Sequence, residues 1–331
     1  MSRGAMTGTR TVCDDISNSP LHGLRCLVLG AGGFLGQALS AALCDRGAVV
    51  QGYGRISDLD KTRNTRVIWT NGLFSDLSAL ARVVDGQEIV FHTLSSTIPE
   101  SANREPAEDL IANVFSTIKL LDLCRFGGVR KVIFASSGGT VYGMPAVIPT
   151  PETASTDPIS AYGISKLAIE KYLALYRRVH DLNYQVLRIA NPYGPGQSPF
   201  KKQGVVAALL HRALSGQPLE IWGTGDVTRD FVHVDDVSNA FLHALHYTGE
   251  HRIMNVGSGQ GRSVNQIVND LHDILDLQDI EITRKSGRAV DVPISILDTE
   301  LIRRVTSWQP RVSWASGLRG TAAWMREAYK L

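Results

Sequence analysis

The sequence predicts an α/β fold: a doubly wound parallel sheet with a smaller, interleaved C-terminal lobe. From Leu24 onward, apolar runs of strand length alternate with stretches of helical hydrophobic period. Most runs are apolar at consecutive positions, as in strands that are buried on both faces. A glycine-rich turn follows the first run. Together these features indicate a parallel sheet that is covered by helices on both sides.

The predicted elements follow one another in chain order. Strands are expected over residues 25–29, 48–51, 67–70, 89–93, 131–136 and 184–190. Helices are expected over residues 34–46, 77–84, 107–125 and 161–180. After Asn191 the chain becomes rich in Pro and Gly, which marks a second lobe. Further on, residues 231–234 and 253–256 are expected to return to the sheet, whereas a helix over 264–275 and a terminal helix with Trp324 complete the smaller lobe.

These patterns divide the chain into three parts. Residues 1–23 are rich in Ser, Thr, Gly, Asn and Asp without a hydrophobic period, and we expect a disordered tail there. A dinucleotide-binding domain is predicted over residues 24–190 plus about 231–257. The remaining residues, 191–230 plus 258–331, form the predicted substrate-binding lobe.

Composition excludes several classes of protein. The 331 residues include 34 Lys+Arg and 32 Asp+Glu, so a net charge of +2 gives no reason to expect nucleic acid as a partner. No apolar run approaches the length of a membrane span, and the N-terminal segment lacks a signal-peptide hydrophobic region. The four cysteines have no metal-ligand spacing. We therefore expect a cytoplasmic protein with reduced thiols, no metal site and no membrane association.

The glycine-rich turn is the first candidate site. Gly30, Gly33 and Gly36 follow an apolar strand at three-residue intervals, and Phe34 and Leu35 open the next helix. Glycine permits the tight turn and a close backbone approach, and free N–H groups at the helix N-terminus favour an anion. In this strand–loop–helix context the motif predicts a Rossmann site for a dinucleotide pyrophosphate.

The end of the second strand leaves the dinucleotide open. An acid there usually holds the adenosine ribose, whereas an Arg accommodates a 2′-phosphate. Here the chain reads Gly54-Arg55, and the first acids, Asp58 and Asp60, come later in the loop. Arg55 is consistent with NADP, as a bidentate phosphate ligand, and equally with a solvated loop residue.

A second motif places Tyr162 and Lys166 four residues apart, on one face of a predicted helix. A free phenol titrates near ~10 and is a poor base at neutral pH, but an adjacent ammonium lowers its pKa. An ordinary surface Tyr/Lys pair is the alternative interpretation. Because the pair follows a dinucleotide loop, it favours hydride chemistry with a tyrosine acid/base.

At this point the chain resembles the extended short-chain dehydrogenase/reductases of the NAD-dependent epimerase/dehydratase family, and within them the nucleotide-sugar 4-epimerases of the UDP-glucose 4-epimerase kind. The resemblance runs from about Leu24 to the C-terminus. The segments that carry it are the Gly30/Gly33/Gly36 loop and residues 136–143, 162–166, 187–192 and 229–236.

The resemblance implies a set of site residues. The catalytic residues would be Tyr162, Lys166, Thr140 and Ser137. Besides the glycine loop, Tyr162 and Lys166, the cofactor would be lined by Arg55, Gly72, Leu73, Thr93, Leu94, Ser95 and Asn113. The substrate would contact Thr140, Asn191, Arg229, Arg288 and Ser295, with the two arginines clamping a diphosphate. The acids Asp235 and Asp236 are expected to cap a helix rather than to take part in catalysis.

Three departures from the family pattern qualify this set. Related epimerases commonly carry Ser or Thr at the position of Gly138, so Ser137 or Thr140 must supply the hydroxyl here. The Asp-Glu pair of the dehydratase branch is replaced by Gly139-Thr140, which disfavours dehydration. Ser295 stands where some of these epimerases carry a bulky Tyr, and it leaves room for an N-acetyl group.

The resemblance therefore implies a 4-epimerase acting on a UDP-hexose or UDP-N-acetylhexosamine through a 4-keto intermediate, with tightly bound NAD. The alternatives are an NADP-dependent reductase of a nucleotide-linked 4-keto-6-deoxysugar and a non-catalytic dinucleotide-binding protein. A homodimer is expected through the helices that begin near Ala107 and Tyr162. Their apolar residues Ile118, Leu121, Ile169 and Leu173 could face either a partner or the chain's own sheet. Polysaccharide precursors are the implied pathway.

Overall fold

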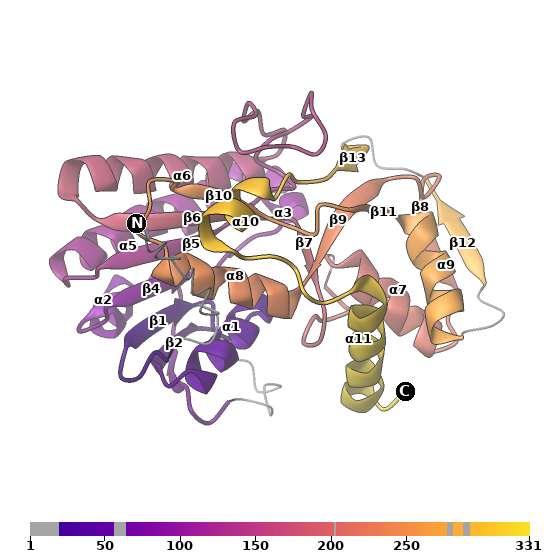
Figure 1. The fold of residues 1–331 in the computed structure, drawn as a ribbon, viewed down its shortest axis with the longest axis horizontal. Helices are drawn as coiled ribbons and strands as arrows, with labels where there is room; N and C mark the ends of the chain where they lie inside the picture. Colours follow the sequence, from indigo (N-terminus) through magenta and orange to yellow (C-terminus); the bar gives the residue numbers. More distant parts are fainter. Residues whose placement is uncertain (1–19, 56–63, 202, 277–280, 287–291) are drawn as a thin grey trace, which may run out of the picture.

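A computed structural model describes residues 20–55, 64–201, 203–276, 281–286 and 292–331. Its main element is a seven-stranded sheet of order β10-β6-β5-β4-β1-β2-β3, in which every pairing is parallel (Figure 1). The strands are β1 (Arg25–Leu29), β2 (Val49–Gly54), β3 (Ile68–Asn71), β4 (Ile89–His92), β5 (Lys131–Ser137), β6 (Asn183–Ile189) and β10 (Ile253–Val256). The predicted doubly wound fold is confirmed.

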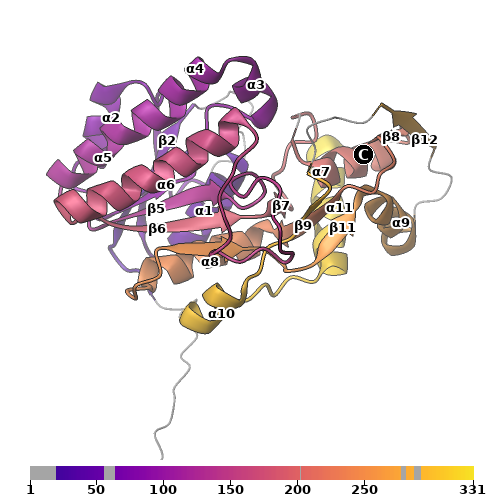
Figure 2. The same cartoon turned by 90° about the horizontal axis from the view of Figure 1, so that it is seen from above.

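Helices cover both faces of this sheet, as the view from above shows (Figure 2). One face carries α2 (Leu77–Val84), α5 (Ser116–Phe126) and α6 (Ala161–His180), with α3 (Pro99–Arg104) and α4 (Pro106–Asp109) at its edge. The other face carries α1 (Phe34–Asp45), α8 (Val234–His246) and α10 (Glu300–Thr306). Each layer has its own buried apolar cluster, as the consecutive apolar strand residues require.

The smaller lobe is built around β9 (Thr228–His233), which pairs with three short strands. These are β7 (Asn191–Tyr193), β11 (Gly261–Ser263) and β13 (Ile294–Ser295). A second, two-stranded sheet joins β8 (Leu219–Trp222) to β12 (Ile282–Lys285). The lobe's helices are α7 (Val205–Leu214), α9 (Val264–Leu275) and α11 (Trp314–Tyr329), which bury a third apolar cluster.

Three predictions differ from the structure. Residues 231–234, expected to return to the main sheet, instead end β9 of the smaller lobe and begin α8, and of the two returning segments only residues 253–256 join the main sheet, as β10. The expected tail ends at Gly23, yet Leu21 is buried and its N–H donates to the Arg46 carbonyl, so the packed chain begins before Leu24. Residues 1–19 lie outside the described part. The single helix expected over 107–125 is instead α4, a π-helical segment η2 (Leu110–Phe115) and α5. A hydrophobic period does not distinguish a π-helical turn from an α-helical one.

The apolar residues proposed for either a partner or the sheet face the sheet. Leu121, Ile169 and Leu173 are buried in the apolar cluster of the α2/α5/α6 layer, and Ile118 packs against it. Among the described residues, no helix has the length and apolar character that a membrane crossing requires.

Candidate active site

The glycine loop joins β1 to α1 at the carboxyl edge of the sheet. Gly30 has a φ of +81°, and a Cβ there would lie 2.9 Å from the Leu94 backbone. A Cβ on Gly36 would lie 2.1 Å from the Gly30 carbonyl oxygen. A side chain at either position would therefore push the loop away from its neighbours, and both glycines keep the turn tight.

The N-terminus of α1 is open to an anion. Gly33 caps the helix without a side chain, and no acid occupies the first turn, which contains Phe34, Leu35 and Gly36. The N–H groups of a first turn have no partner within the helix, and the helix dipole adds positive potential there. These residues fit a dinucleotide pyrophosphate. Phe34 also lines a cavity of about 320 Å³ to which α1, β3, α8 and α11 contribute.

The residues that are expected to contact the adenosine of a bound dinucleotide follow β2 and β3. Arg55 is exposed directly after β2, whereas Asp58 and Asp60 lie outside the described residues. Gly72 donates its N–H to the Gly54 carbonyl. The Leu73 side chain is exposed, and its carbonyl accepts a hydrogen bond from buried Tyr53 (2.8 Å). Arg55, Gly72 and Leu73 thus sit at neighbouring strand ends, beside the glycine loop.

The segment after β4 lies next to the same loop. Thr93 donates both its N–H and its hydroxyl to the Leu29 carbonyl. Leu94 is partly buried, and Ser95 is exposed. Asn113 of η2 is buried, and its amide binds the Ser96 N–H and the Thr97 hydroxyl at 2.9 Å each. Asn113 therefore holds this segment in place.

Tyr162 and Lys166 occupy the first two turns of α6, which Ser160 caps through the Gly163 N–H. Lys166 is buried and donates to the Ala135 carbonyl of β5 (2.9 Å). Its Nζ lies 5.5 Å from the centroid of the Tyr162 ring. The i, i+4 spacing thus brings the ammonium and the phenol together, as the sequence predicts.

Burial works against the charged form of both groups. It raises the pKa of Tyr162 to about 12, although a hydrogen bond with Ser95 lowers the pKa in part. It lowers the pKa of Lys166 to about 8, and the carboxylates of Asp109 and Glu170 act in the opposite direction. The phenol is therefore protonated across the neutral pH range. The Lys166 ammonium loses its proton at a pH just above that range.

The turn after β5 packs against the start of α6. A Cβ on Gly163 would lie 2.7 Å from the Thr140 carbonyl oxygen, so only glycine lets α6 approach this turn. The Thr140 hydroxyl is buried and has no hydrogen-bond partner within the structure. Ser137, at the end of β5, is partly buried. Of the two hydroxyls proposed to replace the one missing at Gly138, that of Thr140 is the one that is fully buried without a partner among the described residues.

The space beside Gly138 is filled by another part of the chain. A Cβ at this position would lie 2.4 Å from a Leu297 methyl group and 3.1 Å from the Arg188 carbonyl oxygen. Leu297 is buried and follows β13 of the smaller lobe. The missing side chain is thus matched by an apolar residue that occupies its place.

The predicted substrate residues gather on the β9 sheet. Asn191 of β7 donates to the Asp230 carbonyl (3.0 Å). Arg229 of β9 donates to the Val292 carbonyl (2.6 Å) and pairs in register with Ser295 of β13. Arg288 lies outside the described residues. Three of the four positions proposed on this lobe therefore belong to adjoining strands.

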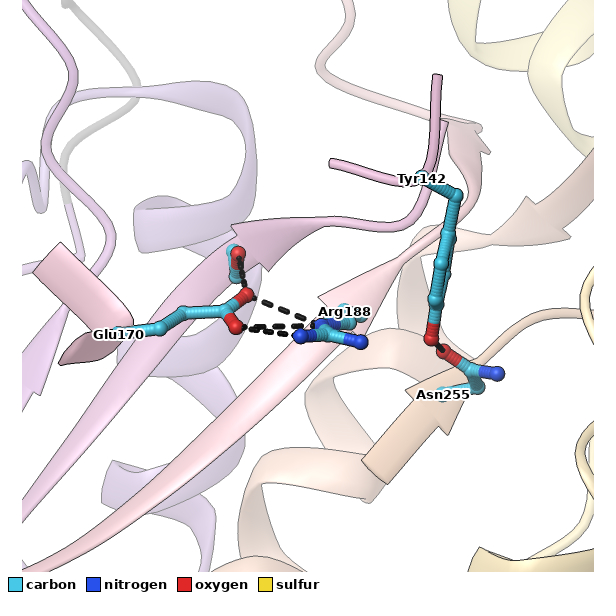
Figure 3. A network of polar contacts seen from close by, with 5 residues as sticks. Tyr142, Glu170, Arg188 and Asn255 are labelled. Atoms are coloured by element: carbon cyan, nitrogen blue, oxygen red, sulfur yellow. Dashed lines mark hydrogen bonds and ion pairs between the residues drawn. The ribbon is translucent and has the colours of Figure 1, made fainter. Parts of the chain in front are cut away.

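Two buried carboxylates near Lys166 escaped the sequence analysis. Asp109 accepts hydrogen bonds from Asn113 and Ser165. Glu170 forms a two-pronged ion pair with Arg188 (2.6 Å at the shortest; Figure 3). An acid inside a predicted helix is ordinary, and the only available signal was its spacing of four residues from Asn113 or Lys166.

Neither acid at the start of α8 is the residue that caps the helix. His233 caps the helix by accepting from the Asp235 N–H. The buried carboxylate of Asp236 instead accepts from the backbone N–H groups of Arg311 and Val312 (2.9 and 3.1 Å). Asp236 therefore anchors the segment that leads to α11, while both acids still lie in the first turn, where the helix dipole favours them.

The parallel sheet, its glycine loop and the Tyr162–Lys166 pair define the class of the short-chain dehydrogenase/reductase fold. The NAD dependent epimerase/dehydratase family matches residues 26–257, and the chain belongs to this family. It is similar to a UDP-glucose 4-epimerase of Mycolicibacterium smegmatis, at 35% identity over 92% of this chain and 99% of the relative.

A second relative has a different printed activity. A dTDP-4-dehydro-6-deoxyglucose reductase of Escherichia coli is 27% identical over 88% of this chain and 94% of its own length. Among solved structures, the UDP-glucose 4-epimerase of Thermotoga maritima with UDP-glucose has a TM-score of 0.85 and 35% identity, covering 92% of this chain and 99% of that one. The chain is thus an NAD-dependent family member whose relatives act on nucleotide sugars.

Proposed function

We propose that this protein is a nucleotide-sugar 4-epimerase that inverts C4 of a UDP-hexose or UDP-N-acetylhexosamine through a 4-keto intermediate. The observation that carries the proposal is the arrangement of Tyr162, Lys166 and the unpartnered Thr140 hydroxyl around the start of α6, at the carboxyl edge that also bears the glycine loop. A phenol, an ammonium and a free hydroxyl are the groups that proton transfer to and from a sugar alcohol requires.

Each of these residues has a role in the reaction. Tyr162 acts in its phenolate form, which takes the proton of the C4 hydroxyl and later returns it, and the role of the Lys166 ammonium beside the ring is to stabilise that phenolate. The Thr140 hydroxyl binds the reacting oxygen. The first turn of α1 would hold NAD, and the bound nicotinamide would supply a hydride acceptor for C4 and a donor for the return of hydride to the opposite face of the sugar.

The direct test is turnover with UDP-glucose/UDP-galactose and the corresponding N-acetyl sugars. Tyr162→Phe removes the proton acceptor and should lower kcat about 10²- to 10⁴-fold with the dinucleotide still bound. Tyr172→Phe is the matched control, because this tyrosine lies on the same helix and is exposed. Turnover of the Tyr162→Phe variant within twofold of the wild type contradicts the assignment.

Thr140 and Ser137 are separated by a pair of alanine variants. We expect Thr140→Ala to lower kcat more than Ser137→Ala, because the Thr140 hydroxyl is buried without another partner. The opposite order assigns the missing hydroxyl to Ser137.

Discrimination between sugars is proposed to involve Ser295. This residue is buried and lies beside Arg229 in the β9 sheet, and its side chain is smaller than the Tyr that some related epimerases carry. Ser295→Tyr should reduce kcat/KM for the N-acetyl sugar more than for the unsubstituted sugar. Equal losses for both sugars count against this role.

The second candidate is an NADP-dependent reductase of a nucleotide-linked 4-keto-6-deoxysugar, which the exposed Arg55 after β2 favours. A reductase releases its cofactor in each turnover, whereas the epimerase cycle returns the hydride and retains it. Denaturing the purified protein and identifying the released dinucleotide separates the two. Retained NAD supports the epimerase, and an empty protein that consumes NADPH with a keto sugar supports the reductase.

We also infer a homodimer in which a second copy covers the face formed by η2 and α6, which pack together. The exposed large apolar residues of these two elements include Leu110, Ile111, Phe115, Ile164, Leu175 and Val179. Leu175→Glu should yield a monomer by sedimentation, whereas Ile68→Glu, exposed on the edge strand β3, should not. A wild-type monomer contradicts the inference.

A further inference from the structure

The carboxylate of Asp109 is buried among neutral hydrogen-bond donors. It accepts from Thr97, from Asn113 (2.9 Å) and from the Ser165 hydroxyl of α6. None of the ion pairs within the described residues includes it. A buried anion is costly unless a positive charge lies near it, so the surroundings of this carboxylate call for a cation.

The candidate cation is the ammonium of Lys166, which lines a small cavity together with Asp109. The lining of this cavity includes Asp109, Ser95, Tyr162, Ser165 and Lys166. The negative charge of Asp109 attracts the Lys166 ammonium. This attraction raises the pKa of Lys166 and so opposes the effect of burial, which lowers it. The same anion disfavours ionisation of the Tyr162 phenol. A negative charge stabilises the protonated form of both groups, so its two effects have the same sign.

The other groups that face Lys166 are already balanced or neutral. Glu170, on the next turn of α6, is paired with Arg188 of β6. His92 of β4 lies near Lys166, and burial lowers its pKa to about 3, so it is uncharged in the neutral range. On the β5 side, the ammonium lies over the Phe134 ring and donates to the Ala135 carbonyl, and neither group is charged. Asp109 is thus the one described carboxylate near Lys166 without a guanidinium of its own.

We propose that Asp109 is a positioning residue for the catalytic pair: its carboxylate ties α6 to the segment after β4 and serves as the counter-ion of the Lys166 ammonium. The Ser165 bond fixes the residue next to Lys166, and the Thr97 and Asn113 bonds fix the segment that carries Ser95. The catalytic function of the pair rests on the proposed 4-epimerase activity, whereas the counter-ion role does not.

The first test measures Lys166 directly and needs no turnover. In protein labelled with ¹³C at lysine Cε, the Lys166 resonance is assigned with Lys166→Met and followed from pH 6 to pH 10. Asp109→Asn removes the charge with little change of shape and should lower the Lys166 midpoint by about one pH unit. Lys131 is an internal control: burial lowers its pKa to about 8 as well, and its partners lie at the end of α8.

Two further variants separate charge from position. Asp109→Glu keeps the charge and should restore the Lys166 midpoint toward the wild-type value. Glu108→Gln removes an exposed charge at the adjacent position and should leave the midpoint unchanged. A Lys166 midpoint that does not move in folded Asp109→Asn overturns the counter-ion role.

A measurement on the wild type keeps the proposal testable if Asp109→Asn does not fold. The carboxyl carbon of Asp109, labelled with ¹³C, should shift as Lys166 loses its proton, because the two charges interact. An Asp109 signal that is insensitive to that titration overturns the proposal in the same way.

The consequence for catalysis has its own readout. With the Asp109 charge removed, Lys166 and Tyr162 both lose their protons at lower pH, so the whole pH profile of kcat should move to lower pH. A purely structural role lowers kcat at every pH without moving the profile. If the wild type shows no epimerase turnover, the proposed function fails, while the lysine titration still decides the role of Asp109.

Discussion

Two buried carboxylates flank Lys166, and the chain satisfies them differently. Glu170 meets the Arg188 guanidinium in a two-pronged ion pair and accepts a further bond from Ser136. Asp109 meets only hydroxyl and amide donors. The charge of a carboxylate is largely neutralised when a guanidinium pairs with it. A carboxylate that is held by neutral groups still exerts its full electrostatic effect on nearby residues. The comparison separates a group that holds the fold together from one that acts on the site.

The ion pair belongs to a longer polar network that runs from α6 across β6 to β10 (Figure 3). The Arg188 guanidinium lies over the Tyr142 ring at 4.8 Å, and the Tyr142 hydroxyl donates to Asn255 of β10 (2.7 Å). The Asn255 amide donates in turn to the carbonyls of Thr150 and Asp298. The pair therefore supports the segment that carries Leu297, and its loss should be felt mainly as a loss of stability.

The largest expected effect follows from breaking this pair. Arg188→Met leaves the Glu170 charge buried without a partner and should lower the free energy of unfolding by about 4 kcal/mol. Urea denaturation measures the change. The double variant Arg188→Met/Glu170→Met should recover most of the loss, because it removes both charges. If the single variant is as stable as the wild type, the pair is not structural and the contrast with Asp109 disappears.

A smaller effect is expected at Lys131, a buried cation whose partners within the described part of the chain are all neutral, and so the reverse of Asp109. Its ammonium donates to the carbonyls of Ala244 and Tyr247 at the end of α8 (2.6 Å each). Burial lowers its pKa from 10.5 to about 8. The unfolded chain thus binds more protons between these values, and the stability of the wild type should rise with pH across this range.

Lys131→Met leaves the helix-end carbonyls unpaired and should cost about 2 kcal/mol at pH 10. The difference in unfolding free energy between variant and wild type should become smaller toward pH 8, because the folded wild type then buries a charged Lys131. Unfolding curves of both proteins at several pH values measure the gap. A gap that is constant with pH contradicts the assigned titration.

The smallest effect is expected for Ser165→Ala, which removes one donor from Asp109 and leaves its charge. We expect a loss of about 1.5 kcal/mol in unfolding free energy and a Lys166 midpoint close to that of the wild type. The lysine titration described for Asp109→Asn provides the comparison. If both variants move the midpoint equally, then position rather than charge sets it.

The sequence predicted the parts of the molecule that depend on local patterns. Consecutive apolar residues indicated the parallel strands, and the spacing of Gly30, Gly33 and Gly36 indicated the loop between β1 and α1. The four-residue spacing of Tyr162 and Lys166 placed both on one face of α6. In each case the physical cause lies within one element or between neighbours in sequence.

Features that depend on contacts distant in sequence were not predictable. Nothing near Gly138 indicates that Leu297 fills its place, and nothing near Asp236 indicates that its carboxylate binds the backbone at Arg311. Asp109 looked like an ordinary acid in a helix, because the hydroxyl of Ser165 reaches it from another helix. The order of the elements was predictable from the sequence, but the hydrogen-bond partners of buried polar groups were not.

The contact between Gly138 and Leu297 has a consequence for the synthesis of the chain. The glycine loop and the Tyr162–Lys166 pair are synthesised by about the midpoint of translation, since chains are made N-terminus first. The wall beside Gly138 is completed only when Leu297 arrives with β13, near the end. A nascent chain can therefore pair six strands of the main sheet, β1 to β6, well before Leu297 completes the packing beside Gly138, whereas the edge strand β10 follows later.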